Sequence, residues 1–292
     1  NDVFFLISGY FLLPRAIGQP HQAQATLRRV GVTLVSVALY ALLALGIDTL
    51  VIPIDGVGLD DLGWLLEGLE FIWVYLAVII ITPALALLAR RAKRRRGIAL
   101  VAILATICLN AYIAFFSPGD AERGLLEWRK LMSAVTYLMA YVTGALMATS
   151  KKRPSDGRRL LRVTIVACVL VEACLALLEM PEVLVATSFK STSMLSFVLA
   201  VASMAYATSR EAKRADYTFI RFANSILGFY IVQSMTSGWW RPLFENLTSE
   251  SAIGGFGALL LSGVILSFAL ICGIIVLDQA LRIRLLRKLK LA

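Results

Sequence analysis

Residues 70–89 read EFIWVYLAVIIITPALALLA, and residues 90–96, which follow directly, read RRAKRRR. The first stretch has about the 20 residues, most of them apolar, that a helix needs to cross the hydrocarbon core of a bilayer. Its apolar residues do not alternate with polar ones, as they would in a strand of a transmembrane barrel. A segment in hydrocarbon must satisfy its own backbone hydrogen bonds, and a helix does so. The stretch therefore predicts a transmembrane helix that ends in a basic connection.

Apolar runs of the same kind recur along the whole chain of 292 residues. Overall, 59% of the residues are apolar and 16% are charged, a balance that excludes an ordinary soluble domain. Four cysteines are too few for a disulfide framework. We predict an all-α, polytopic transmembrane helix bundle, with residues 1–292 forming a single membrane domain. The other predicted helices lie near 3–13, 30–52, 97–116, 131–149, 160–180, 189–208, 218–236 and 255–281.

The lysines and arginines are concentrated in every second connection. Of the 29 basic residues, 24 fall on one side of the predicted membrane, and the positive-inside rule makes that side, with the C-terminus, cytoplasmic. Their dispersion over five short stretches argues against nucleic-acid binding. Binding of anionic head groups, or of the phosphates of a nucleotide-like cofactor, stays open. These residues are Arg15, Arg28, Arg29, Arg90, Arg91, Lys93, Arg94, Arg95, Arg96, Lys151, Lys152, Arg153, Arg158, Arg159, Arg162, Arg210, Lys213, Arg214, Arg221, Arg282, Arg284, Arg287, Lys288 and Lys290.

The first apolar run, residues 3–13, is too short to cross a bilayer by itself. The chain begins with Asn1 on the predicted outer side, and no signal peptide precedes the run. One more helix upstream, starting in the cytoplasm, would complete this arrangement. We therefore expect ten helices in the intact protein, nine of them in the present chain.

Four segments carry a family resemblance. They are NDVFFLISGYFL at 1–12, LRRV at 27–30, the aromatic-rich EFIWVY at 70–75, which leads to a Thr-Pro pair, and SILGFYIVQ at 225–233. The first segment resembles the second transmembrane helix of the acyltransferase-3 family, and the others are similar to its later motifs in the same order. In the family the aromatic-rich helix ends in a proline. Its members are integral membrane O-acyltransferases that modify cell-surface polysaccharides, and they typically have ten helices.

The resemblance implies transfer of an acyl group, usually acetyl, from cytoplasmic acyl-CoA to a hydroxyl of a lipid-linked or surface glycan. The family's catalytic histidine lies on its first helix, so we expect it upstream of Asn1, and a later family histidine is replaced by Gln233. Acyl-CoA is the expected co-substrate, and no metal is expected. Guanidinium groups bind phosphates through paired hydrogen bonds, so Arg28, Arg29 and Arg15 are candidates for binding CoA. Their alternative role is to set the topology.

Polar residues inside predicted spans form a second set of candidates. Glu172 lies near the middle of its span, where an ionised side chain costs roughly 2.5–3.5 kcal/mol, so it is a functional candidate that should face the interior or a polar cavity. The structural alternative is a hydrogen bond to Asn110 or Tyr112. Asn224 and Gln233, on one later helix, and Asp278, near the inner end of the last, are weaker candidates with the same two interpretations, functional or structural. Tyr230 is a further intramembrane polar candidate.

The motif residues Ser8, Gly9 and Tyr10 lie in the first run. Ser8 lacks the strand–turn–helix setting of a nucleophile elbow, so close packing of helices around Ser8 and Gly9 is the better interpretation. His21 is the only histidine and is expected in a solvated loop. A single histidine without clustered carboxylates does not indicate a metal site.

Two other functions remain compatible with the sequence. Glu172 could couple a transporter or a flippase of a lipid-linked glycan to protons, although no internal repeat is evident between the halves of the chain. A non-catalytic membrane partner of a polysaccharide synthase is the other alternative. The expected partners are the bilayer and a glycan acceptor, and the expected location is the cytoplasmic membrane.

Overall fold

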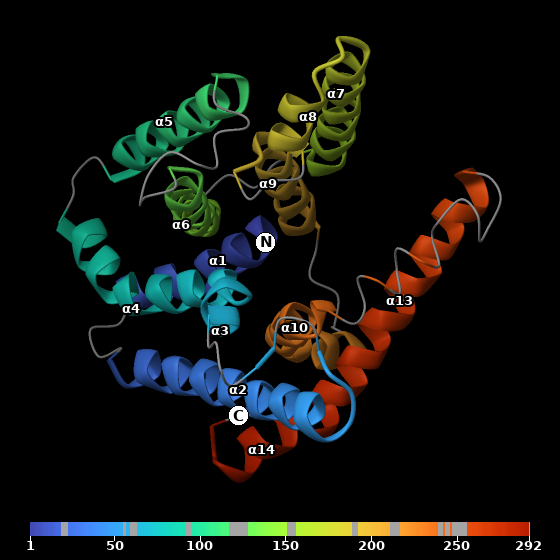
Figure 1. Cartoon of the computed structure of the whole chain (residues 1–292). Coiled ribbons are helices and arrows are strands. Elements are labelled where there is room, and N and C mark those ends of the chain that lie inside the picture. Colours follow the sequence, from blue (N-terminus) through green and yellow to red (C-terminus); the bar gives the residue numbers. More distant parts are fainter. Residues whose placement is uncertain are drawn as a thin grey trace. The chain divides into compact units, whose positions relative to one another are not determined.

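The computed structural model describes residues 1–18, 23–54, 57–58, 63–91, 95–116, 128–150, 156–188, 192–210, 217–238, 242, 246 and 256–291. Within these residues the regular structure is entirely helical (Figure 1). Each of the nine predicted apolar runs contains a helix. Six helical stretches of the described part are long and apolar enough to cross a membrane, and they lie in α2, α4, α5, α6, α7 and the α13–α14 segment. The prediction of an all-α, polytopic bundle is confirmed.

The helices fall into two compact units. The first comprises residues 1–23 and 80–212, and the second comprises residues 24–79 and 213–292. Helix α4 (Glu70–Arg91) contributes its first half to the second unit and its second half to the first. It continues through Pro83 to Arg91, in agreement with the helix predicted over 70–89.

In the first unit, α1 packs against α6 and α9, and α5 also packs against α6 (Figure 1). Helix α9 packs in turn against α7 and α8. The helices of this unit, besides the end of α4, are α1 (Asp2–Gly18), α5 (Arg95–Phe116), α6 (Trp128–Thr149), α7 (Gly157–Leu177), α8 (Pro181–Ser188) and α9 (Met194–Ser209).

Between the helices predicted over 160–180 and 189–208, the structure has a further short helix that the sequence did not predict. Pro181 begins the short helix α8, a position where its missing N–H costs nothing. Helix α9 begins only after Ser193, whose side chain accepts a hydrogen bond from the backbone N–H of Ser196 (3.0 Å). With 16 residues, α9 is about 24 Å long, shorter than a bilayer core of about 30 Å. The predicted helix over 189–208 is therefore present as α9, but it begins later and is shorter than predicted, and α8 precedes it.

The second unit is built on a hydrophobic core shared by α2, the start of α4, α10 and α13. Tyr40 and Ala44 of α2 pack with Ile72 of α4, Ile231 of α10 and Ile274 of α13. All five are buried, so each helix turns one face to this core and leaves other faces exposed. The helices are α2 (Ala23–Leu50), α3 (Gly63–Glu67), α10 (Tyr217–Met235), α13 (Phe256–Ala280) and α14 (Arg282–Lys288).

Candidate functional site

The motif residues Ser8, Gly9 and Tyr10 lie on α1, at its interface with α6. Gly9 is buried, while Ser8 and Tyr10 are half-buried. A Cβ built on Gly9 would overlap the backbone carbonyl of Tyr141, and one on Gly144 would overlap the carbonyl of Leu6. Each helix thus places a glycine where the other helix's backbone passes. The prediction that Gly9 allows close helix packing is confirmed.

Two tyrosines of α6 hold neighbouring segments in the same unit. The Tyr137 ring stacks on Phe5 with a centroid separation of 4.8 Å, and its hydroxyl accepts a hydrogen bond from the Asn1 side chain (2.9 Å). The hydroxyls of Tyr141 and Thr82 lie 2.8 Å apart and share a buried hydrogen bond. Because these contacts tie α1 and α4 to one face of α6, the motif helix is held in a defined position.

The end of α1 that is predicted to be cytoplasmic is capped by an arginine of α4. Arg90 donates through Nη2 to the carbonyl of Ala16 and through Nε to the carbonyl of Ile17, both at 2.8 Å. These carbonyls belong to the last turn, where a cation also complements the helix dipole. Arg15 is in the same turn but is exposed, with its guanidinium 5.8 Å from the centre of the Phe11 ring. Arg90 therefore has a structural role in capping α1, whereas the guanidinium of Arg15 is exposed.

The other two CoA candidates lie near the start of α2, in the second unit. Arg28 is exposed and donates from Nε to the carbonyl of Leu291 (3.1 Å), while Arg29 is half-buried. The three candidates thus divide between the units, with Arg15 in the first and Arg28 and Arg29 in the second.

The second unit contains a buried polar group that we call the Asp278 cluster, made of Tyr40, Asp278, Arg282 and the backbone carbonyl of Asn224. The Asp278 carboxylate receives two hydrogen bonds from Arg282, from Nε to Oδ1 (2.5 Å) and from Nη2 to Oδ2 (2.8 Å). The Tyr40 hydroxyl donates to Oδ1 (2.7 Å), and Nη2 of Arg282 also donates to the Asn224 carbonyl (2.7 Å). The side chains of Asp278 and Arg282 are 0% and 3% exposed.

Helix α10 packs closely against the Asp278 cluster. Gly228 of α10 lies directly against the Asp278 carboxylate and the Arg282 guanidinium, where a Cβ would not fit. One residue along, Gln279 donates to the Ser225 hydroxyl (2.5 Å). Arg282 is one of the 24 basic residues counted on the cytoplasmic side, and its guanidinium is buried in this ion pair. The i, i+4 spacing of Asp278 and Arg282 was the available sequence signal.

The remaining intramembrane candidates are separate from one another. Asn110 is buried and donates to Thr136 of α6 (2.8 Å), whereas Tyr112 is exposed and stacks on Phe116. Glu172, on α7, is half-buried. The hydrogen bond considered between Glu172 and Asn110 or Tyr112 does not form among these three described residues.

On α10, Tyr230 stacks on Phe71 of α4 with a centroid separation of 4.7 Å, and Gln233 is half-buried one turn further along. His21 lies outside the described residues. No group of three or more histidine, cysteine, aspartate or glutamate residues that could hold a metal ion occurs in the part of the chain that the structure describes.

Comparison with known proteins agrees with the motif helix and the bundle. The acyltransferase-3 family profile, described as an acyltransferase domain, matches residues 1–272. No curated protein and no solved structure matches the chain. The match covers α1 to most of α13 and ends before Asp278 and Arg282. The chain belongs to the acyltransferase-3 family and is a multi-pass membrane acyltransferase.

Proposed function

We propose that the protein transfers an acyl group, normally acetyl, from acyl-CoA to a hydroxyl of a cell-surface or lipid-linked glycan, and that it does so in the cytoplasmic membrane. The observation that carries the proposal is the motif helix α1. The family segment of residues 1–12 is a helix held against α6, and Arg15 is exposed at its predicted cytoplasmic end. This arrangement supports a site for an anionic co-substrate where the family's chemistry is expected.

The reaction needs a base and a phosphate-binding site. The glycan hydroxyl oxygen attacks the thioester carbonyl carbon, an ester C–O bond forms, the C–S bond breaks, and the CoA thiolate takes up a proton. A histidine is suited to accept the hydroxyl proton, because the pKa of its side chain lies near the pH of the medium. In this proposal the base is the family histidine expected before Asn1. Arg28, which is exposed near the start of α2, would bind a CoA phosphate.

The direct test is a genetic complementation. The full-length gene is introduced into a host that lacks it, and the O-acetyl groups of the surface glycan are measured by NMR, with the empty vector as the control. We expect acetyl signals to appear only with the gene. An unchanged glycan would contradict the proposal, and proton-coupled uptake in its place would support the transporter alternative.

Arg28→Ala should raise the KM for acyl-CoA about tenfold, since a charge-assisted hydrogen bond to phosphate contributes roughly 1.5 kcal/mol. Arg28→Lys should recover only part of this loss, because an ammonium cannot form the paired hydrogen bonds of a guanidinium. The measurement is acyl transfer by purified protein at varied acyl-CoA. Arg287→Ala is the matched control, because Arg287 is also an exposed arginine of the second unit, in the last turn of α14. Equal KM values for Arg28→Ala and Arg287→Ala would contradict the assignment of Arg28.

A further inference from the structure

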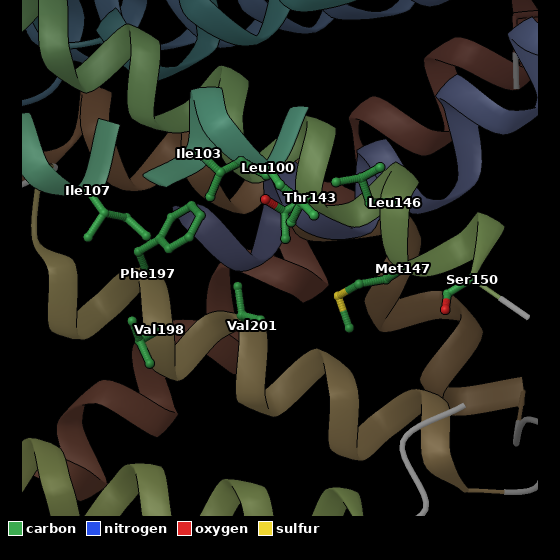
Figure 2. A pocket seen from close by; sticks show the side chains of 10 residues that line it. All are labelled: Leu100, Ile103, Ile107, Thr143, Leu146, Met147, Ser150, Phe197, Val198 and Val201. Atoms are coloured by element: carbon green, nitrogen blue, oxygen red, sulfur yellow. The ribbon is translucent and has the colours of Figure 1, made fainter. Parts of the chain in front are cut away.

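A groove of about 430 Å³ lies in the first unit between α5, α6 and α9. Figure 2 shows Ser150 at one end of the groove and Ile107 with Phe197 toward the other. Leu100 and Val201 are also among the residues that line it. The volume is in the range of small-molecule sites. It is a partly open groove rather than an enclosed cavity.

The groove lies at membrane depth, in the half predicted to face the cytoplasm. Helix α5 begins at Arg95 and α6 ends at Thr149, and both ends adjoin basic stretches. Leu100 lies one to two turns into α5, whereas Ile107 is 12 residues from its start, about 18 Å along the helix. The groove therefore runs from the Ser150 end toward the middle of the bilayer.

The lining excludes a polar occupant. Its residues are apolar except for Thr143 and Ser150. The Thr143 hydroxyl donates to the carbonyl of Met139 in its own helix (2.7 Å), and Ser150 lies at the end of the groove. The inner part thus offers an apolar chain close contact and gives a polar ligand little to bind.

The Ser150 end is positively charged. Arg96 is exposed and donates from Nη2 to the carbonyl of Thr149 (2.6 Å), the residue before Ser150. Lys151, Lys152 and Arg153 follow Ser150 directly in the sequence. The nearest acid in the sequence after Ser150 is Asp156, whose carboxylate accepts a hydrogen bond from the backbone N–H of Arg159.

We propose that this groove binds one acyl chain of an anionic glycerophospholipid of the cytoplasmic leaflet, with the lipid phosphate held at Arg96. The chain enters from the bilayer through the open side, and the exposed Arg96 favours a negative head group through its charge. The inference does not rest on the proposed acyl transfer, because it uses neither the motif helix nor the CoA candidates.

The test measures lipids that remain bound to the purified full-length protein by native mass spectrometry, with phosphatidylglycerol and phosphatidylcholine of identical chains supplied in equal amounts. Wild-type protein should retain more phosphatidylglycerol. Leu100→Trp fills the groove and should lower retention of both lipids by on the order of tenfold. Leu104→Trp is the matched control, because Leu104 is also exposed on α5 and does not line the groove. Val198→Trp provides a second groove variant if Leu100→Trp does not fold.

Arg96→Gln should reduce the preference for phosphatidylglycerol over phosphatidylcholine about fivefold, since one cationic residue contributes about a factor of five to binding a net anionic lipid. Phosphatidylcholine should lose less, because its choline offsets the charge of its phosphate. Arg91→Gln, on α4, which gives no residue to the groove, should not change the preference. Equal retention of the two lipids by wild type, or equal loss in Leu100→Trp and Leu104→Trp, would overturn the proposal. Displacement of the lipid by equimolar long-chain acyl-CoA would also overturn it, because the groove would then belong to the acyl donor.

Discussion

Replacing Asp278 by alanine should lower the free energy of unfolding by about 3–5 kcal/mol, the loss expected when one partner of a buried ion pair is removed. The substitution leaves the Arg282 guanidinium buried without its carboxylate and takes the acceptor away from the Tyr40 hydroxyl. Unfolding of the purified protein by SDS in mixed micelles measures the change.

Three further variants separate the effect of the ion pair from a general effect of mutating α14. Arg282→Ala should destabilise the protein about as much as Asp278→Ala, whereas Arg284→Ala, at an exposed position on the same helix, should change stability by about 0.5 kcal/mol or less. The double variant of Asp278 and Arg282 should be less destabilised than the sum of the single variants, because neither buried charge is left alone. Additive losses would contradict a direct coupling between the two side chains.

The helices could be predicted from the sequence because hydropathy and charge are read along the chain. The run at 70–89 with its basic end predicts a transmembrane helix without knowledge of its neighbours, and α4 occupies Glu70–Arg91. The same pattern did not predict the short helix α8 and the capped turn before α9. There the decisive features are local, Pro181 at a helix start and the Ser193 cap, and they oppose the surrounding apolar pattern.

The partners of polar side chains could not be predicted in the same way. Arg282 follows the last apolar run, so its position alone indicates an exposed cytoplasmic charge. Its burial depends on Tyr40 and Gly228, which lie on other helices and meet it only in the folded second unit. Glu172 shows the converse, because a carboxylate in the middle of a span is expected to face the bundle interior or a polar cavity, and on α7 it is half-buried. Which helices meet is a property of the packed bundle, and the hydropathy pattern does not contain it.

Gly9→Leu should abolish the packing of α1 against α6 and with it any acyl transfer that depends on the motif helix. Even the first added carbon would overlap the Tyr141 carbonyl, a backbone atom that cannot rotate away, so the two helices would have to separate. Gly9→Ala already requires this shift and should cost on the order of 1–3 kcal/mol, the range for overpacking. The change is measured as the loss of stability in the same SDS titration and as the loss of O-acetyl groups on the glycan.

The matched control is Gly46→Ala, in the apolar part of α2 four residues before its end at Leu50, where a new Cβ meets nothing within 4 Å. Alanine is the better helix former by about 0.8–1 kcal/mol, so this variant should be as stable as wild type or more stable. In Gly144→Ala, the new Cβ on α6 would overlap the carbonyl of Leu6 on α1. This variant should therefore lose as much stability as Gly9→Ala. If Gly9→Ala and Gly46→Ala gave the same stability, glycine would act at both positions only through helix propensity. A deficit confined to Gly9 and Gly144 would instead show that backbone contact between α1 and α6 holds the motif helix in place.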